Sequence, residues 1–137
     1  MREVILQKNI SFAKRIVKHL PQAIRNKLPV EITVVSVSAK ESLALNRAYR
    51  KKRTPANVLS FFYSREYGEI MVCPVLIRAE AKARGNSFEY QMTWMIIHGM
   101  LHLAGIHHEA SAKAERTFEK TERRALEKLA QLNSRSS

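Results

Sequence analysis

Two histidines four residues apart are the side chains in this sequence best placed for metal chemistry. His98 and His102 lie in a segment without proline, and a helix would project both imidazoles from one face, one turn apart. Gly105 follows where helices commonly end, because glycine adopts the left-handed backbone conformation at little cost. The chain can therefore turn there and bring a third imidazole to the pair, from His107 or His108. Of these two we favour His108.

Three imidazoles suit a borderline-soft divalent ion. Zinc is the default choice, and another divalent transition metal would satisfy the same ligands. Three protein ligands leave one coordination position for water, which is typical of a catalytic ion. A fourth ligand from His107 would instead close the site and make the ion structural. We predict one Zn²⁺ held by His98, His102 and His108.

The H-x3-H-x5-H spacing is also that of the long zinc-protease motif, in which a glutamate follows the first histidine as the general base. Gly99 stands at that position and has no proton acceptor on its side chain. A peptidase would need a glutamate from elsewhere, with Glu69 and Glu109 as the candidates. The pattern therefore indicates a metal-dependent hydrolase that works differently from these peptidases.

The charge of the chain favours a polyanionic partner. Lysine and arginine number 24 against 12 acidic residues, a formal net charge of +12, and most of the excess lies in residues 1–60. Four consecutive basic residues precede Thr54-Pro55, more than the capping of a helix requires. Arg50 is the predicted catalytic residue, because a guanidinium can hold a phosphodiester with two hydrogen bonds. The predicted nucleic-acid contacts are Arg47, Arg50, Lys51, Lys52 and Arg53.

Two parts of the chain resemble the YbeY endoribonuclease family, whose members are rRNA maturation factors. Residues 98–108 are similar to its H-G-x-L-H-L-x-G-Y-D-H signature, and residues 45–50 with 57–61 are similar to its other conserved block. The resemblance implies metal ligands at His98, His102 and His108, a functional arginine at Arg50, and a zincin-like fold. The sequence departs from the family pattern at Ile106-His107 for Tyr-Asp, Asn57 for Asp, Phe62 for Pro and Gly68-Glu69 for Gly-Asp.

Hydrophobic periodicity and helix-breaking residues predict an α/β (α+β) domain, with a mixed sheet of about four strands packed with about five helices. We expect a single domain over residues 1–132 and a disordered tail over 133–137. The expected strands are 2–8, 30–37, 58–63 and 69–73, and the expected helices begin near Asn9, Ala39, Pro74, Phe88 and Ala110. The single cysteine, Cys73, is predicted to be buried. No signal peptide or membrane span is expected, which favours the cytoplasm.

Together these features predict a metal-dependent endoribonuclease that prefers single strands. The resemblance implies a role in rRNA maturation and ribosome quality control, with rRNA or its precursors and a ribosomal subunit as partners. We expect no membrane association and infer no obligate protein partner. Two alternatives remain at this point: a ribosome-assembly RNA-binding factor with a structural zinc, and a metallopeptidase-like hydrolase.

Overall fold

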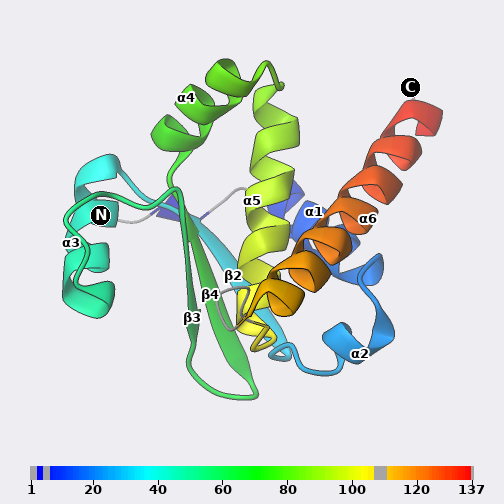
Figure 1. Cartoon of the computed structure of the whole chain (residues 1–137), viewed down its shortest axis with the longest axis horizontal. Helices are drawn as coiled ribbons and strands as arrows, with labels where there is room; N and C mark the ends of the chain where they lie inside the picture. Colours follow the sequence, from blue (N-terminus) through cyan, green and yellow to red (C-terminus); the bar gives the residue numbers. More distant parts are fainter. Residues whose placement is uncertain (1–2, 5–6, 107–110, 137) are drawn as a thin grey trace.

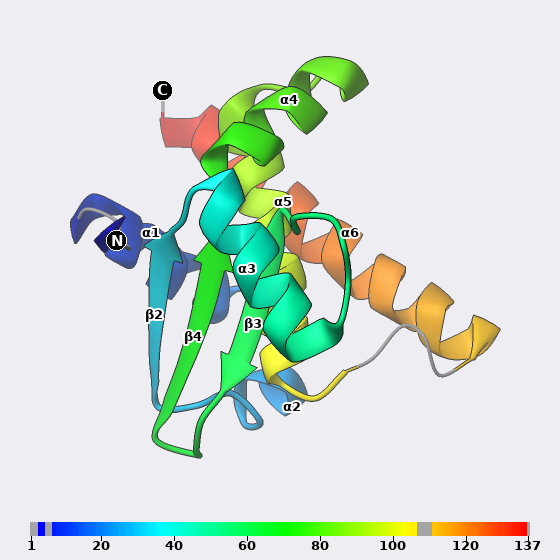
Figure 2. The ribbon, with the colours of Figure 1, turned by 90° about the vertical axis from the view of Figure 1, so that its left-hand side faces the viewer.

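A mixed sheet of four strands separates one helix from a layer of three others. The computed structural model describes residues 3–4, 7–106 and 111–136. Figures 1 and 2 show α3 on one face of the sheet, and α1, α5 and α6 on the other. The strands are β1 Glu3–Val4, β2 Glu31–Ser36, β3 Val58–Phe62 and β4 Tyr67–Val72, and the helices are α1 Gln7–Lys18, α2 Gln22–Arg25, α3 Ala39–Arg50, α4 Pro74–Arg84, α5 Phe88–Leu103 and α6 Ala112–Ser136.

The strand order, β1-β2-β4-β3, places β3 at an edge of the sheet. Strands β2 and β4 are parallel, whereas β1 pairs with β2 and β3 pairs with β4 in the antiparallel sense. Side chains alternate between the two faces of a strand. On β4, Ile70 therefore packs in the cluster around α5, while Met71 packs with Leu59 in the cluster beneath α3.

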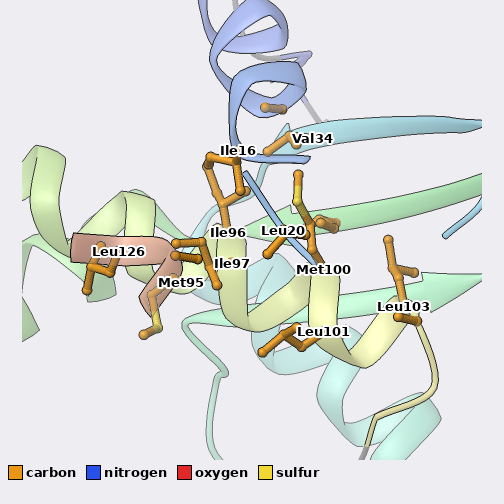
Figure 3. Packing of buried hydrophobic residues seen from close by; sticks show 14 of the residues in the cluster. Ile16, Leu20, Val34, Met95, Ile96, Ile97, Met100, Leu101, Leu103 and Leu126 are labelled. Atoms are coloured by element: carbon orange, nitrogen blue, oxygen red, sulfur yellow. The ribbon is translucent and has the colours of Figure 1, made fainter. Parts of the chain in front are cut away.

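Helix α5 is the centre of the larger hydrophobic cluster. Its residues from Met95 to Leu103 are buried except His98 and His102, which are partly exposed. Figure 3 shows apolar side chains of α5 meeting those of neighbouring elements, including Ile16 and Leu20 of the α1 region, Val34 of β2 and Leu126 of α6. An apolar helix held on several sides has little freedom to shift or rotate, so the two histidines have a rigid support.

The structure confirms the predicted fold class and corrects several details. A capping box starts α3, with Ser38 and Glu41 bonded reciprocally. Cys73 is fully buried, as predicted. Residues 7 and 8, expected in the first strand, belong to α1 instead. Pro21 precedes the short helix α2, where a second helical turn was expected, and α6 extends through residues 133–136. None of the described helices is long and apolar enough to span a bilayer.

Gly99 allows α5 to approach the sheet closely. A Cβ atom at this position would lie 2.9 Å from Cγ2 of Ile70 and 3.0 Å from Oγ of Ser60. The same Ser60 hydroxyl donates a hydrogen bond of 2.8 Å to the carbonyl oxygen of Gly99. Ile70 is fully buried and branched at Cβ, so its methyl group has little room to move.

We therefore expect Gly99→Ala to lower the free energy of unfolding by about 1–2 kcal/mol, because overpacking outweighs the roughly 1 kcal/mol gained from helix propensity. Urea denaturation measures the change. Ala79→Gly, at an exposed position inside α4, is the control for propensity and should cost about 1 kcal/mol. A Gly99→Ala variant about 1 kcal/mol more stable than the parent, the full gain in helix propensity, would show that this packing is not tight.

Candidate metal centre and cleft

The two imidazoles on α5 face each other through the same ring nitrogen. Nε2 of His98 and Nε2 of His102 are 3.2 Å apart, and the ring centroids are 4.7 Å apart. Two nitrogens bound to one tetrahedral zinc at the usual bond length would be separated by about 3.3 Å. The pair therefore has the spacing of two ligands to one ion.

Two side chains of helix α6 contact this histidine pair. Oε2 of Glu122 accepts a hydrogen bond of 2.7 Å from Nδ1 of His98, and the Glu122 side chain is only 9% exposed. The neutral tautomer that fits this contact carries its proton on Nδ1 and a lone pair on Nε2. The buried Phe118 ring packs against both histidines, with centroid distances of 5.0 Å and 5.3 Å. A carboxylate behind a histidine and a fixed ring are the usual support of a metal ligand.

The third predicted ligand, His108, lies outside the described residues, as do His107 and Glu109. The part of the chain that leads to them is described: Gly105 has φ +81° and ends the helix as expected. Within residues 3–4, 7–106 and 111–136, no group of three or more His, Cys, Asp or Glu side chains is placed to hold a metal. The described donors are two of the three predicted imidazole ligands, and His107 and His108 follow them closely in the sequence.

The histidine pair opens into a cleft of about 870 Å³. One wall is strand β3 at the edge of the sheet, and the others come from the C-terminal ends of α3 and α5. Arg50 lines this cleft together with His98 and His102, so the fold brings the predicted catalytic arginine to the predicted metal ligands. Lys27, which sequence reasoning did not select, lines it too.

The other predicted RNA-binding residues are close to Arg50 in the sequence, and they do not line the cleft. Arg47, Lys51, Lys52 and Arg53 are all exposed on α3 or on the loop that follows it. Two buried side chains of α3 hold this loop: Asn46 donates through Nδ2 to the Thr54 carbonyl at 2.7 Å, and the Ser42 hydroxyl donates to the Ala56 carbonyl at 2.6 Å. These hydrogen bonds hold the backbone of the loop that carries Lys51, Lys52 and Arg53.

A profile of the Endoribonuclease YbeY family matches residues 2–130. The chain belongs to this family. It is 42% identical over 94 residues to "Endoribonuclease YbeY" of Thermotoga petrophila, a match that covers 66% of this chain and 63% of that relative. The chain is 38% identical over 112 residues to the protein of the same name from Chelativorans sp., covering 75% of this chain and 68% of the relative. The matched part therefore spans less than two thirds of the Thermotoga relative.

A solution structure of a Thermotoga maritima protein has a similar fold. It aligns with 96% of this chain and 93% of its own, with a TM-score of 0.56 and 26% sequence identity. The likeness extends over nearly the whole chain, so the described architecture is common to both proteins.

The structure explains one departure from the YbeY pattern, at Asn57, and places another, Glu69. Asn57 donates through Nδ2 to Oε2 of Glu80 at 2.8 Å, and Gln91 donates to the other oxygen of Glu80 at 2.9 Å. An aspartate at position 57 would place two carboxylates in contact, so asparagine suits this chain. Glu69 lies on the α3 face of the sheet, opposite the face that packs on α5, and bonds to Tyr63 and Tyr67. Glu69 is therefore not placed to act as a base beside the histidines.

The sequence analysis did not select Glu122 and Phe118 as residues of the metal site. Their spacing of four residues on α6 puts both on one helix face, but nothing in that spacing indicates that this face meets α5 at His98. The available signal was an acidic residue on the inward side of an otherwise amphipathic helix, next to Phe118 and Ala125.

We expect Glu122→Gln to weaken zinc binding by about 10- to 100-fold, because the neutral amide supports the Nδ1 proton of His98 less well. Competition against a chromophoric chelator measures the affinity. Glu119→Gln, an exposed residue of the same helix, is the matched control and should leave zinc binding unchanged. Equal zinc affinities for the parent and Glu122→Gln would show that this contact does not support a metal ligand.

Proposed function

We propose that this chain is a metal-dependent endoribonuclease that prefers single-stranded RNA. The observation that carries the proposal is the common cleft of His98, His102 and Arg50 in a member of the YbeY family. An imidazole pair spaced for an ion and a guanidinium beside it match the needs of phosphodiester hydrolysis. The open edge of β3 offers room for an extended strand along the cleft.

The residues divide into two roles. His98, His102 and His108 would hold one zinc ion, or another divalent transition metal, which when bound supplies Lewis acidity toward a phosphoryl oxygen and acidifies water. Arg50 binds the scissile phosphate and stabilises the negative charge that grows on it. Arg47, Lys51, Lys52 and Arg53 contact neighbouring phosphates and direct the strand toward the cleft.

The cellular role that we propose is rRNA maturation and ribosome quality control in the cytoplasm. Its substrates would be rRNA or rRNA precursors, free or on a ribosomal subunit. The family supports this assignment, and the net charge of +12 supports a polyanionic partner.

Two alternative functions can be tested against this proposal. A ribosome-assembly factor with a structural zinc would need four protein ligands, and X-ray absorption on the zinc-loaded protein counts them. A metallopeptidase-like hydrolase is disfavoured because the sheet crowds the Gly99 position and Glu69 lies on the other face. Glu109 lies outside the described residues.

His102→Ala should abolish stoichiometric zinc binding and RNA cleavage while leaving the affinity for single-stranded RNA nearly unchanged. The affinity comes mainly from phosphate contacts, which this substitution does not touch. Metal analysis, a cleavage assay on single-stranded RNA and a binding titration give the three values. His19→Ala, the histidine just after α1, is the control and should behave as the parent. Cleavage by metal-free His102→Ala would refute the proposal.

Arg50→Ala should lower kcat about 10²- to 10³-fold, because charge stabilisation in the transition state is lost. Lys52→Ala, a basic residue of the same exposed run, should raise KM and leave kcat unchanged. Steady-state kinetics on one RNA substrate separates the two effects. If Arg50→Ala changes KM alone, the arginine binds substrate without assisting the reaction.

A further inference from the structure

Four aromatic side chains follow one another beside the cleft, on the α3 face of the sheet. We call Tyr49, Phe61, Tyr63 and Tyr67 the aromatic row. The Phe61 and Tyr63 rings are stacked with centroids 6.4 Å apart, and the Tyr63 and Tyr67 rings with centroids 5.6 Å apart. Tyr49, at the end of α3, meets Phe61 edge to face at 5.3 Å.

The rings are ordered although they are not buried. Tyr49 is 68% exposed and Tyr63 is 58% exposed, both unusually high for a tyrosine in a folded domain. The hydroxyl groups of Tyr63 and Tyr67 bond to the two carboxylate oxygens of Glu69, at 3.2 Å and 3.4 Å. Glu69 itself is buried in β4. The stacking and this shared carboxylate hold the rings in place while much of their surface stays in contact with water.

The aromatic row is continuous with the cleft. Three of its rings, Tyr49, Phe61 and Tyr63, line a hollow of about 350 Å³ between α3 and the sheet. Tyr49 and Phe61 also line the cleft that contains Arg50. A strand of nucleic acid that leaves the cleft past Arg50 therefore reaches these rings first.

The charges around the row suit a polyanion. Arg50, next to Tyr49 at the end of α3, is exposed and lines the same cleft as Tyr49 and Phe61. The carboxylate of Glu41 also lines the hollow, but its Oε1 accepts a hydrogen bond of 3.1 Å from the Ser38 backbone N–H. That bond lowers the pKa of Glu41 and holds its carboxylate against the backbone at the start of α3.

We propose that the aromatic row is a base-stacking platform for single-stranded RNA, on which bases next to the cleaved phosphate stack while their phosphates pass Arg50. This inference rests on the proposed nuclease function and adds how the substrate is recognised. Stacking needs an unpaired base but tolerates every base, so the platform selects single strands without selecting a sequence. In a duplex the base faces are covered, and the same rings have nothing to stack on.

The test compares Tyr63→Ala with Tyr63→Phe, because phenylalanine keeps the ring and removes only the hydroxyl bonded to Glu69. Binding of a fluorescein-labelled oligouridylate long enough to cover the cleft and the row is measured by anisotropy, with chelator present to prevent cleavage. Tyr63→Ala should bind on the order of tenfold more weakly, whereas Tyr63→Phe should bind as the parent does. Tyr90→Ala, an exposed tyrosine at the other end of α5, should have no effect.

Three results would overturn the platform: equal affinities for the parent and Tyr63→Ala, equal losses for Tyr63→Ala and Tyr63→Phe, or the same loss with double-stranded RNA. Each leaves the nuclease proposal intact if the zinc-loaded parent still cleaves RNA. Absence of cleavage by the parent is instead a failure of the proposed function. Should Tyr63→Ala fail to fold, crosslinking of 4-thiouridine RNA to the parent decides, with crosslinks expected in residues 61–67 and their absence counting against the platform.

Discussion

The close packing of α5 on the sheet is the constraint on which the site depends. Gly99 lets the helix backbone approach within contact distance of Ile70 and Ser60, and the Ser60 hydroxyl bonds to the Gly99 carbonyl. Since His98 precedes Gly99 and His102 follows it by three residues, their positions are set by this contact. Gly99 stands where the protease motif has its glutamate base, and the same residue lets α5 pack closely on the sheet.

The site is assembled from parts that serve different purposes. Helix α5 supplies imidazoles on a buried support, and α6 supplies the carboxylate and the ring that orient them. Helix α3 brings Arg50 to the same cleft from the other side of the β3 edge. Because β3 is the edge strand among the described strands, the cleft stays accessible along its length, which suits a polymeric substrate better than a small one.

The fold class could be predicted because its signals are local. The apolar run of α5, the Ser38–Glu41 capping box and the alternation in β2 each determine one element from neighbouring residues. The end of the helix at Gly105 followed from glycine's conformational freedom. Errors occurred at the N-terminus, where a short apolar run is compatible with either strand or helix, and the structure assigns residues 7 and 8 to α1.

The sequence by itself determined the spacing of the histidine pair, the helix that carries it, the glycine that ends it and the basic run after α3. These features depend on the period of the helix and on residue type, so neighbouring residues in the sequence are enough to predict them. Only the tertiary structure decided that Glu122 supports His98, that Arg50 shares the cleft with the imidazoles, and that four aromatic rings continue it. Those contacts join residues far apart in the chain, and they depend on strand order and on which face of each helix is buried, which the local pattern of a single sequence does not specify.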